Sequence, residues 1–457
     1  MFPYRTFDLL RRICMEKLFK LKQNNTTVRT EIVAGITTFL AMAYILVVNP
    51  GMLAEAGMDY NAVFLATAVS AAIATLCMAF FANYPVALAS GMGLNAYFTY
   101  TICLGMGVDW RVALTAVLVE GLIFIVLSLC KFREALVNAV PANLKYGITA
   151  GIGLFIAFVG LQGSGVVIAS SSTLVDLGAI GSAEFALSMI GLLIIGVLYH
   201  YKVKGSILIG ILATWILGII CQFLGWYQGV SLLPDFSNWT LIPKVGESTL
   251  FQFDFTWAGQ HLMDFIVIVF SFLFVDLYDT AGTLIGVASK GNLLDKDGKL
   301  PRAGGALLAD AVGTVVGACL GTSTVTSYVE SSAGVSAGGR TGLTAVTTAI
   351  LFVIAIFFYP IFVAIPGFAT APALVFVGLL MIGAVKNMTF EGDIADVVGG
   401  YLAILLMPLT YSIANGIMFG MLAWVILKLC TGKVKDISPV MWVSFVLFVL
   451  RIITKVI

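Results

Sequence analysis

Gly321 to Gly342 reads GTSTVTSYVESSAGVSAGGRTG, a polar stretch between two long apolar runs. It is rich in Ser, Thr and Gly, and it carries one carboxylate, Glu330. Unpaired backbone groups and charges are costly in lipid, so such a segment is stable at membrane depth only where it faces protein or a water-filled cavity. We therefore expect an extended piece that turns into a short helix near Glu330, as in secondary transporters that hold substrate at broken helices. The alternative is a polar loop outside the membrane.

The composition of the whole chain supports a membrane setting. Of 457 residues, 60% are hydrophobic and only 11% are charged, and apolar runs of about 20 residues recur along the chain. The formal net charge of +1 gives no indication of a nucleic-acid partner. The 7 cysteines are scattered and the 2 histidines lie far apart, so we expect no disulfide framework, no metal site and no cofactor.

The apolar runs predict an all-α polytopic membrane protein with about 14 transmembrane segments in the lipid bilayer. We expect these segments near residues 31–53, 61–83, 87–105, 110–131, 141–161, 183–201, 205–226, 261–288, 303–320, 327–339, 342–364, 369–386, 394–413 and 414–431. The third and tenth, 87–105 and 327–339, are expected to be broken. Residues 437–457 hold one more apolar piece, whose placement the pattern leaves open.

Basic residues are distributed unequally between the loops on the two sides of this arrangement. With the N-terminus inside, only Arg111 and Lys244 fall in the outside loops. The inside loops hold Lys131, Arg133, Lys145, Lys202, Lys204, Lys290, Lys296, Lys299, Arg302, Arg340, Lys386, Lys428, Lys433 and Lys435. Cytoplasmic loops carry such an excess, so we expect a protein of the inner or plasma membrane with a cytoplasmic N-terminus. Residues 1–29 are basic and amphipathic, as in helices that lie on a membrane surface.

The two halves of the chain resemble each other. AVPANLKYGITAGIGLF resembles AIPGFATAPALVFVGLL, which aligns Pro141 with Pro366 and Gly153 with Gly378. Each half would contain seven segments, an odd number, so the second copy must be inverted in the membrane. Inverted repeats with broken helices are a transporter architecture.

Under this symmetry, the counterpart of residues 321–342 is ANYPVALASGMGLNAYFTY, residues 82–100, whose polar side chain is Asn95. Two half-helices that enter from opposite sides would aim their positive ends at the membrane midplane. We therefore expect Asn95 and Glu330 to face each other across a cavity. The alternative for Asn95 is a hydrogen bond that only packs helices together.

Carboxylates also occur inside apolar segments. The eighth segment contains FSFLFVDLYDTAGTLIG, with Asp276 and Asp279 three residues apart and therefore on one helix face. Acids at bilayer depth are functional by default, and we expect Asp276 to hold a proton beside Glu330, which makes these two the proton-coupling residues. For Asp279, a structural bond is as well supported as a substrate contact. Glu120 and Asp310 lack support from symmetry and are expected to make structural or gating contacts.

These runs carry a family resemblance. GMGLNAYF, FLFVDLYDTAGTLIG and GTSTVTSYVESSAGVSAGGRTGLTA, with the ending MPLTYSIANGIMFG, resemble the AzgA-like purine permeases of the nucleobase/ascorbate transporter superfamily. The resemblance covers Thr30 to Lys433. It implies a seven-plus-seven inverted repeat, uptake of hypoxanthine, guanine or adenine together with protons, and frequently a homodimer. The family's substrate positions fall on Asn95, Asp276, Tyr328, Val329 and Glu330.

The resemblance also implies a division into a core domain and a gate domain, the latter forming the dimer contact. We expect an N-terminal segment 1–29, core parts 30–131 and 261–364, gate parts 132–228 and 365–433, an extracytoplasmic loop 229–260, and a tail 434–457. One position departs from the uracil-type relatives, which carry His one turn after the acid of the eighth segment. Here that residue is Thr280, so proton coupling is expected to depend on carboxylates.

The chemistry of these residues suits a 6-oxopurine. A carboxylate accepts hydrogen bonds from ring N–H groups, and an Asn amide offers one donor and one acceptor in a plane. Aromatic candidates for covering the ring faces are Phe39, Tyr44, Tyr97 and Phe98. The alternatives are transport of another nucleobase, xanthine or uracil, or of a small anion, whose site would need positive potential. The sequence has no HExxH metal-binding motif, so we expect a transporter and not an enzyme.

Overall fold

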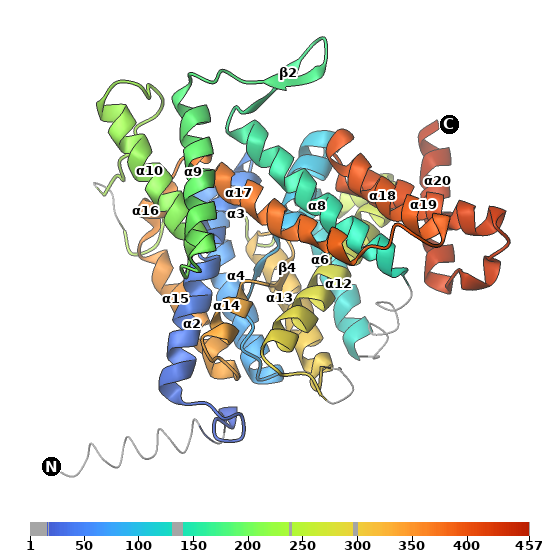
Figure 1. The fold of residues 1–457 in the computed structure, drawn as a ribbon, viewed down its shortest axis with the longest axis horizontal. Coiled ribbons are helices and arrows are strands. Elements are labelled where there is room, and N and C mark those ends of the chain that lie inside the picture. The colour runs from blue at the N-terminus through green and yellow to red at the C-terminus, as the bar shows by residue number, and fades with distance from the viewer. Residues whose placement is uncertain (1–15, 17, 130–139, 237–239, 296–299, 457) are drawn as a thin grey trace.

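The computed structural model describes residues 16, 18–129, 140–236, 240–295 and 300–456 as a bundle of helices (Figure 1). The expected surface helix within 1–29 lies mostly outside the described residues, as do four of the basic loop residues used for the orientation. The described helices follow the order of the segments predicted from the sequence.

The first half of the chain supplies seven of the predicted segments, some of which consist of more than one helix or strand. They are α2 (Val28–Met42) with α3 (Ile45–Glu55), α4 (Tyr60–Phe81), β1 (Leu88–Ser90) with α5 (Met92–Ala96) and the π-helix η1 (Tyr97–Gly105), α6 (Trp110–Leu129), α8 (Ala142–Gly163), α9 (Ala183–His200) and α10 (Ser206–Phe223). Between α8 and α9, strands β2 (Val167–Ser170) and β3 (Leu174–Leu177) form an antiparallel hairpin, which projects at the end of the molecule away from the start of α2 (Figure 1).

The second half supplies seven more elements after the short α11 (Phe255–Gln260). They are α12 (Leu262–Lys290), α13 (Ala303–Leu320), β4 (Val325–Ser327) with α14 (Ser331–Ser336), α15 (Gly342–Ile356) with α16 (Tyr359–Val363), α17 (Gly367–Ile382) with η2 (Gly383–Asn387), α18 (Ile394–Leu409) and α19 (Ile413–Cys430). The chain then continues through η3 (Val434–Asp436) into α20 (Pro439–Val456). The apolar tail, whose placement the sequence left open, is thus a helix that packs against α19 and α12.

The described part of the chain contains 9 helices that are long and apolar enough to cross a membrane. They are α2–α3 taken together, α4, α6, α8, α9, α10, α13, α17 and α19. The other predicted segments are the two broken ones, the long α12, and the shorter helices α15 and α18. This is a multi-pass membrane protein.

Two segments that were expected to be continuous are interrupted. The first is divided at Ala43 and Tyr44, where the backbone bonds from Leu46 to Ala43 and from Val47 to Tyr44 tighten the turn to a three-residue spacing. The eleventh is divided between α15 and α16, just before Pro360. A proline has no N–H to donate, and its ring excludes the helical turn before it, so a helix tends to restart there.

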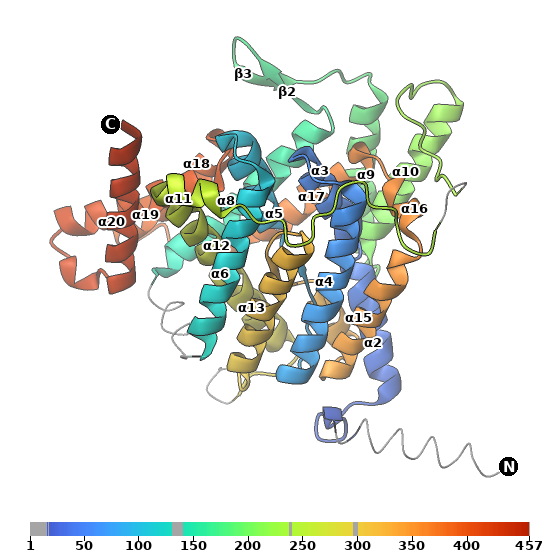
Figure 2. The ribbon, with the colours of Figure 1, turned by 180° about the vertical axis from the view of Figure 1, so that it is seen from behind.

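The packing of the helices repeats between the halves, which confirms the inverted repeat. In the two halves, α2–α3 corresponds to α12, α4 to α13, and α6 to α15. The contact of α15 with α4 therefore corresponds to that of α6 with α13, and the contact of α15 with α2 corresponds to that of α6 with α12. Likewise, α8 corresponds to α17, α9 to α18, and α10 to α19. The contact of α9 with α17 corresponds to that of α18 with α8, and the contact of α9 with α10 corresponds to that of α18 with α19. Figure 2 shows α4, α6, α13 and α15 on one face of the molecule.

The residues that aligned the two halves occupy equivalent places. Pro141 directly precedes α8, and Pro366 directly precedes α17. Where these two helices cross, their aligned glycines meet: a Cβ atom added at Gly153 would lie 2.7 Å from the carbonyl oxygen of Gly378, and one added at Gly378 would lie 2.4 Å from that of Gly153. Such distances leave no room for a side chain, so both positions require glycine at this crossing.

By their contacts, the helices form two groups. One contains α2 to α6 with α12 to α15, and the other contains α8 to α10 with α17 to α19. Fewer contacts join the groups, among them those of α10 with α2 and of α5 with α8. The groups contain the segments that the family resemblance assigns to the core and the gate. That they move as separate domains stays a prediction.

The two broken segments cross at the centre of the first group. Strand β1 pairs with β4 in antiparallel register, with Ala89 opposite Thr326. The crossing is tight, because a Cβ atom added at Gly91 would lie 2.5 Å from Cγ2 of Thr326. Each strand is followed by a short helix, α5 or α14. The sequence predicted this extended piece and short helix for residues 321–342, and a half-helix for residues 82–100.

Candidate functional site

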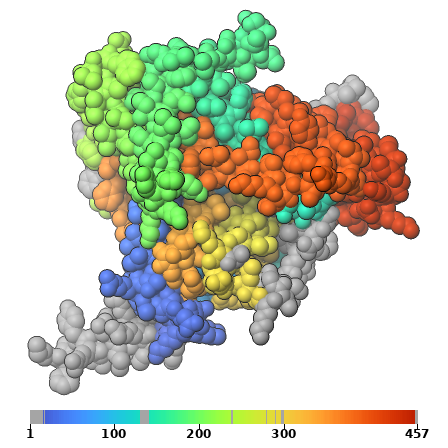
Figure 3. Space-filling view, in the orientation of Figure 1, coloured from blue at the N-terminus to red at the C-terminus, as the bar shows by residue number. Residues whose placement is uncertain are grey.

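A cavity of about 1200 Å³ lies between the two groups of helices. One wall is formed by the junction of α2 and α3, the turn from β1 into α5, the second half of α12, and the turn from β4 into α14. The opposite wall is formed by α8, the link between α9 and α10, and α17 with η2. Figure 3 shows α9 (green), α17 (orange) and α12 (yellow) together on the face that it views.

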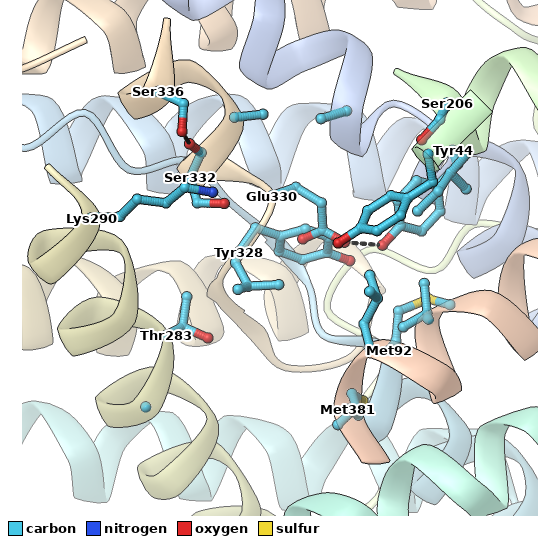
Figure 4. A pocket seen from close by; sticks show the side chains of 18 of the residues that line it. Tyr44, Met92, Ser206, Thr283, Lys290, Tyr328, Glu330, Ser332, Ser336 and Met381 are labelled. Carbon is cyan, nitrogen blue, oxygen red and sulfur yellow. Dashed lines mark hydrogen bonds between the residues drawn. The ribbon is translucent and has the colours of Figure 1, made fainter. Parts of the chain in front are cut away.

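Glu330 lies on the cavity wall. It follows β4 and directly precedes α14, so the extended backbone ends beside the cavity. The hydroxyl of Tyr44, at the junction of α2 and α3, donates a hydrogen bond of 2.6 Å to Oε1 of Glu330 (Figure 4). Tyr44 is fully buried. The carboxylate is therefore held in one orientation on the cavity wall.

The backbone next to Glu330 is also fixed. The N–H of Tyr328 donates to the carbonyl of Ala87 at 3.0 Å, and its hydroxyl donates to the carbonyl of Ser90 at 2.5 Å. Val329 is 51% exposed and lines the cavity. Both residues therefore lie where the family resemblance expects substrate contacts, beside the carboxylate.

Asn95 lies elsewhere. Its side chain is completely buried, and it is not among the residues that line the cavity. Its Oδ1 accepts a hydrogen bond from the hydroxyl of Ser323, and its Nδ2 donates to the carbonyl of Ser90 at 3.5 Å. The cavity side of α5 is instead formed by Met92 and Gly93. The expected arrangement, with Asn95 and Glu330 facing each other across the cavity, is not found.

The two aspartates of α12 are separated as well. Asp279 lines the cavity, as does Thr283 one helical turn further on. Asp276 is completely buried and lies against Thr280, whose hydroxyl is 3.2 Å from its Oδ1. Residues three apart on a helix differ by about 60° in direction, which here is enough to turn one carboxyl into the cavity and the other toward the crossed strands.

Two further acids are buried behind the crossed strands. Thr280 Oγ1 lies 2.8 Å from Oδ1 of Asp310, on α13, and the hydroxyl of Thr324 donates to Oε2 of Glu120, on α6, at 2.9 Å. These bonds agree in kind with the structural contacts expected for Asp310 and Glu120. Over the residues that the structure describes, no group of three or more His, Cys, Asp or Glu side chains is placed to hold a metal ion.

The aromatic candidates are also divided. Tyr44 lines the cavity, whereas the ring of Phe39 packs on Phe352 and that of Tyr97 packs on Phe272. Sequence reasoning named Tyr44 only as one aromatic among four and did not predict its bond to Glu330. The signal that could have selected it is the interruption of the first helix, which spacing alone does not reveal.

Side chains of both charges line the cavity. They include the carboxyl groups of Asp279 and Glu330, and Lys202 and Lys204 of the α9–α10 link, which follow His200 at the end of α9. Lys290, at the end of α12, also lines it. These lysines lie in loops that the charge distribution assigns to the cytoplasmic side.

Comparisons with known proteins agree with this architecture. Residues 29–419 match the model of a family described as a permease family. The chain is 44% identical to a guanine/hypoxanthine permease, PbuO, of Bacillus subtilis, over 95% of this chain and 99% of that protein. It is 39% identical to an adenine permease, AdeP, of Escherichia coli, over 96% of each chain.

A solved structure has the same fold. The transmembrane domain of the cyanobacterial bicarbonate transporter BicA superposes with a TM-score of 0.65, at 18% sequence identity, over 84% of this chain and 96% of that one. At that identity the likeness concerns the arrangement of helices and not the substrate.

Proposed function

Since the chain belongs to the permease family, among the AzgA-like purine permeases, we propose that it imports purine nucleobases by proton symport. Membership of this family makes the protein a transporter and not an enzyme. The observation that supports a purine most directly is the Glu330 carboxylate, held by Tyr44 on the wall of a large cavity.

The cavity wall near Tyr44 has the chemistry that a planar base requires. A carboxylate accepts hydrogen bonds from ring N–H groups, and such charge-assisted bonds are about twice as strong as neutral ones. Val329 and Met92 supply apolar surface for the ring beside it, as in most pockets for small ligands. The similar permeases of known name act on guanine, hypoxanthine or adenine, so we propose one of these as the substrate.

The side of the membrane to which the cavity opens supports an alternating-access mechanism. The cavity extends to the lysines of the predicted cytoplasmic loops, so we propose that this structure is open to the cytoplasm, with the N-terminus on the same side, in the inner or plasma membrane. The group with α2 to α6 would be the core domain and the group with α8 to α10 the gate domain. One would rock against the other around the cavity. We retain a homodimer through the gate domain as part of the proposal.

The residue roles follow from the contacts. We propose that Glu330, with the backbone of Tyr328 and Val329, binds the base, and that Asp279 contributes a second carboxyl from α12. Asn95 would act indirectly, because its amide holds Ser323 ahead of β4. Asp276 keeps its proposed role in proton coupling, without contact to the base.

A small anion is the competing substrate, since a bicarbonate transporter has the same fold. The carboxyl groups of Asp279 and Glu330 on the wall argue against it, because like charges repel an anion in a site of low dielectric. Xanthine and uracil are closer competitors, because both are planar and carry ring N–H groups.

Transport by purified protein in liposomes tests the proposal. Vesicles with an alkaline interior receive labelled hypoxanthine, guanine, adenine, xanthine, uracil or bicarbonate, with or without a protonophore. We expect accumulation of hypoxanthine, guanine or adenine above its external concentration, and loss of that accumulation when the protonophore is added. Accumulation of bicarbonate, xanthine or uracil alone would refute the substrate assignment, and equilibration of the purine that ignores the gradient would refute symport.

A further inference from the structure

A single hydroxyl connects two buried acids behind the crossed strands. Oγ1 of Thr280 lies 2.8 Å from Oδ1 of Asp310, 3.2 Å from Oδ1 of Asp276, and 2.7 Å from Oγ1 of Thr326. The side chains of all four residues are buried, with at most 1% exposure. They come from α12, α13 and β4, so the cluster joins three elements of the same group of helices.

The number of protons in this cluster can be counted. A threonine hydroxyl carries one hydrogen and can accept two hydrogen bonds. If Thr280 donates to one carboxyl, the other carboxyl can bond to Thr280 only by donating a proton of its own. If Thr280 donates instead to Thr326, both carboxyls must donate. In each arrangement in which every contact is an ordinary two-centre hydrogen bond, at least one of Asp276 and Asp310 is protonated.

We propose that Asp276 and Asp310 share a proton through Thr280, and that this pair is where the transporter holds its coupled proton. The inference rests on the proposed symport and deepens it, since Asp310 was expected from the sequence to make only a structural or gating contact. Because neither acid lines the cavity, the proton would be stored beside the substrate and not in contact with it.

Thr326 provides the connection to the substrate. It lies in β4 and is followed by Ser327, which lines the cavity, and by the backbone proposed to bind the base. Its methyl group is confined by Gly91, so Thr326 follows any shift of the crossed strands. Movement of β4 on binding or release of the base would change the third contact of Thr280, and with it the stability of the shared proton.

Besides Asp264 in the first turn of α12, three other carboxyl groups lie on the elements around this pair, and each of these three is a competing place for the proton. Asp279 precedes Thr280 on α12, Glu330 follows β4 on the cavity wall, and Glu120 on α6 bonds to Thr324. An experiment must therefore separate the pair from these acids. Asp279→Asn and Glu120→Gln are the matched carboxyl-to-amide controls.

Infrared spectroscopy detects the proton directly. A protonated carboxyl group has a C=O stretch well separated from that of a carboxylate, and it shifts when the solvent is changed to D2O. We would record purine-induced and pH-induced difference spectra of the purified full-length protein and of Asp276→Asn, Asp310→Asn, Thr280→Val and Thr280→Ser. We expect the carboxylic band of the wild type to be lost in both aspartate variants. It should be shifted in Thr280→Val and retained in Thr280→Ser and Glu120→Gln. Asp279→Asn should retain it in the pH-induced spectra, which do not require purine binding.

Transport by the same variants gives a second readout. Asp310→Asn and Thr280→Val should exchange internal for external purine at a rate within about threefold of wild type, yet fail to accumulate purine when a pH gradient is imposed. Thr280→Ser, which keeps the hydroxyl, should accumulate it normally. The threonine variants keep the test decisive if an aspartate variant fails to fold.

Two results would overturn the inference. One is a carboxylic band that survives in both aspartate variants, and the other is gradient-driven accumulation by Asp310→Asn at the wild-type level. A band that disappears only in Asp279→Asn or Glu120→Gln would place the proton there instead. Failure of the proposed function is a separate outcome, because it would be seen as wild-type protein that does not accumulate purine at all.

Discussion

The two broken segments have matching backbones and different chemistry. Each consists of a short strand and a short helix, and the strands pair with each other. The second segment, β4 with α14, brings Glu330 to the cavity. The first, β1 with α5, presents Met92 and two glycines there, and turns its polar side chain, Asn95, into the protein.

This difference shows that the inverted repeat determines where the chain runs, but not what it offers a ligand. One segment supplies the recognising group, while the other supplies a close surface and hydrogen bonds that hold its partner in place. Both are needed for the site, in different ways. Substitutions in the two segments should therefore have different consequences, and the four predictions below separate them.

The largest effect is expected for Glu330→Gln. It removes the charged acceptor at nearly constant shape, and the loss of a charge-assisted bond in a desolvated site costs about 2–4 kcal/mol, or about 30- to 700-fold in affinity. Purine binding and initial uptake by vesicles measure the loss. Glu391→Gln, the same change at an exposed position, is the control. Near-normal uptake by well-folded Glu330→Gln protein would show that the second segment does not supply the group that recognises the purine.

Gly91→Ala should have the next largest effect, through the fold and not through the ligand. The new methyl group would lie 2.5 Å from Cγ2 of Thr326, and forcing an extra methyl into a packed site costs about 1–3 kcal/mol. We expect a lower melting temperature in detergent together with slower uptake. Gly286→Ala, where a Cβ atom would meet no neighbour within 4 Å, should change neither. Equal melting temperatures for the two variants would show that the strands do not need their close crossing.

Tyr44→Phe tests how the carboxylate is held. The ring remains, but the 2.6 Å bond to Glu330 is lost, so the carboxylate can turn away from the ligand. We expect about tenfold weaker purine binding, which corresponds to about 1.4 kcal/mol, with unchanged stability of the protein. In Tyr44→Phe/Glu330→Gln, the effect of the tyrosine should disappear. Additive losses in this double variant would mean that Tyr44 acts independently of Glu330.

The smallest effect on the ligand is expected for Asn95→Ala. The amide contacts Ser323 and Ser90 and does not line the cavity, so its removal should cost about 1 kcal/mol of stability and leave the order of preference among purines unchanged. Competition among hypoxanthine, guanine and adenine, measured beside a thermal melt, tests this. A changed order of preference at unchanged stability would place Asn95 in contact with the base.

Much of the fold was predictable because hydrophobic length and loop charge are strong signals. The repeat was found from Pro141 and Pro366, which begin two equivalent helices, and the broken segments from their Ser, Thr and Gly content. The breaks at Tyr44 and before Pro360 were missed. An apolar run gives no sign of a helix that tightens or restarts within it, although Pro360 was a local clue.

The site was predictable in part. Glu330 stands out as a carboxylate in a polar stretch at membrane depth, and the structure places it on the cavity wall. Which of Asp276 and Asp279 points there depends on the rotation of α12 about its axis, and helical spacing leaves that rotation undetermined. The position of Asn95 depends similarly on the direction of α5, a short helix that continues directly into the π-helix η1.

The meeting of Gly153 and Gly378 has an evolutionary consequence. In a dimer of two identical, oppositely oriented chains, a residue on the twofold axis touches its own copy, and each mutation occurs on both sides of the contact at once. If the two copies were later joined into one polypeptide, residues that touch across the axis would still constrain each other. Every position away from the axis could then mutate in one half without changing in the other. A fused ancestor of this kind would explain how one half could acquire an acid at the cavity and the other an amide in the interior, while the glycines at the crossing stayed paired.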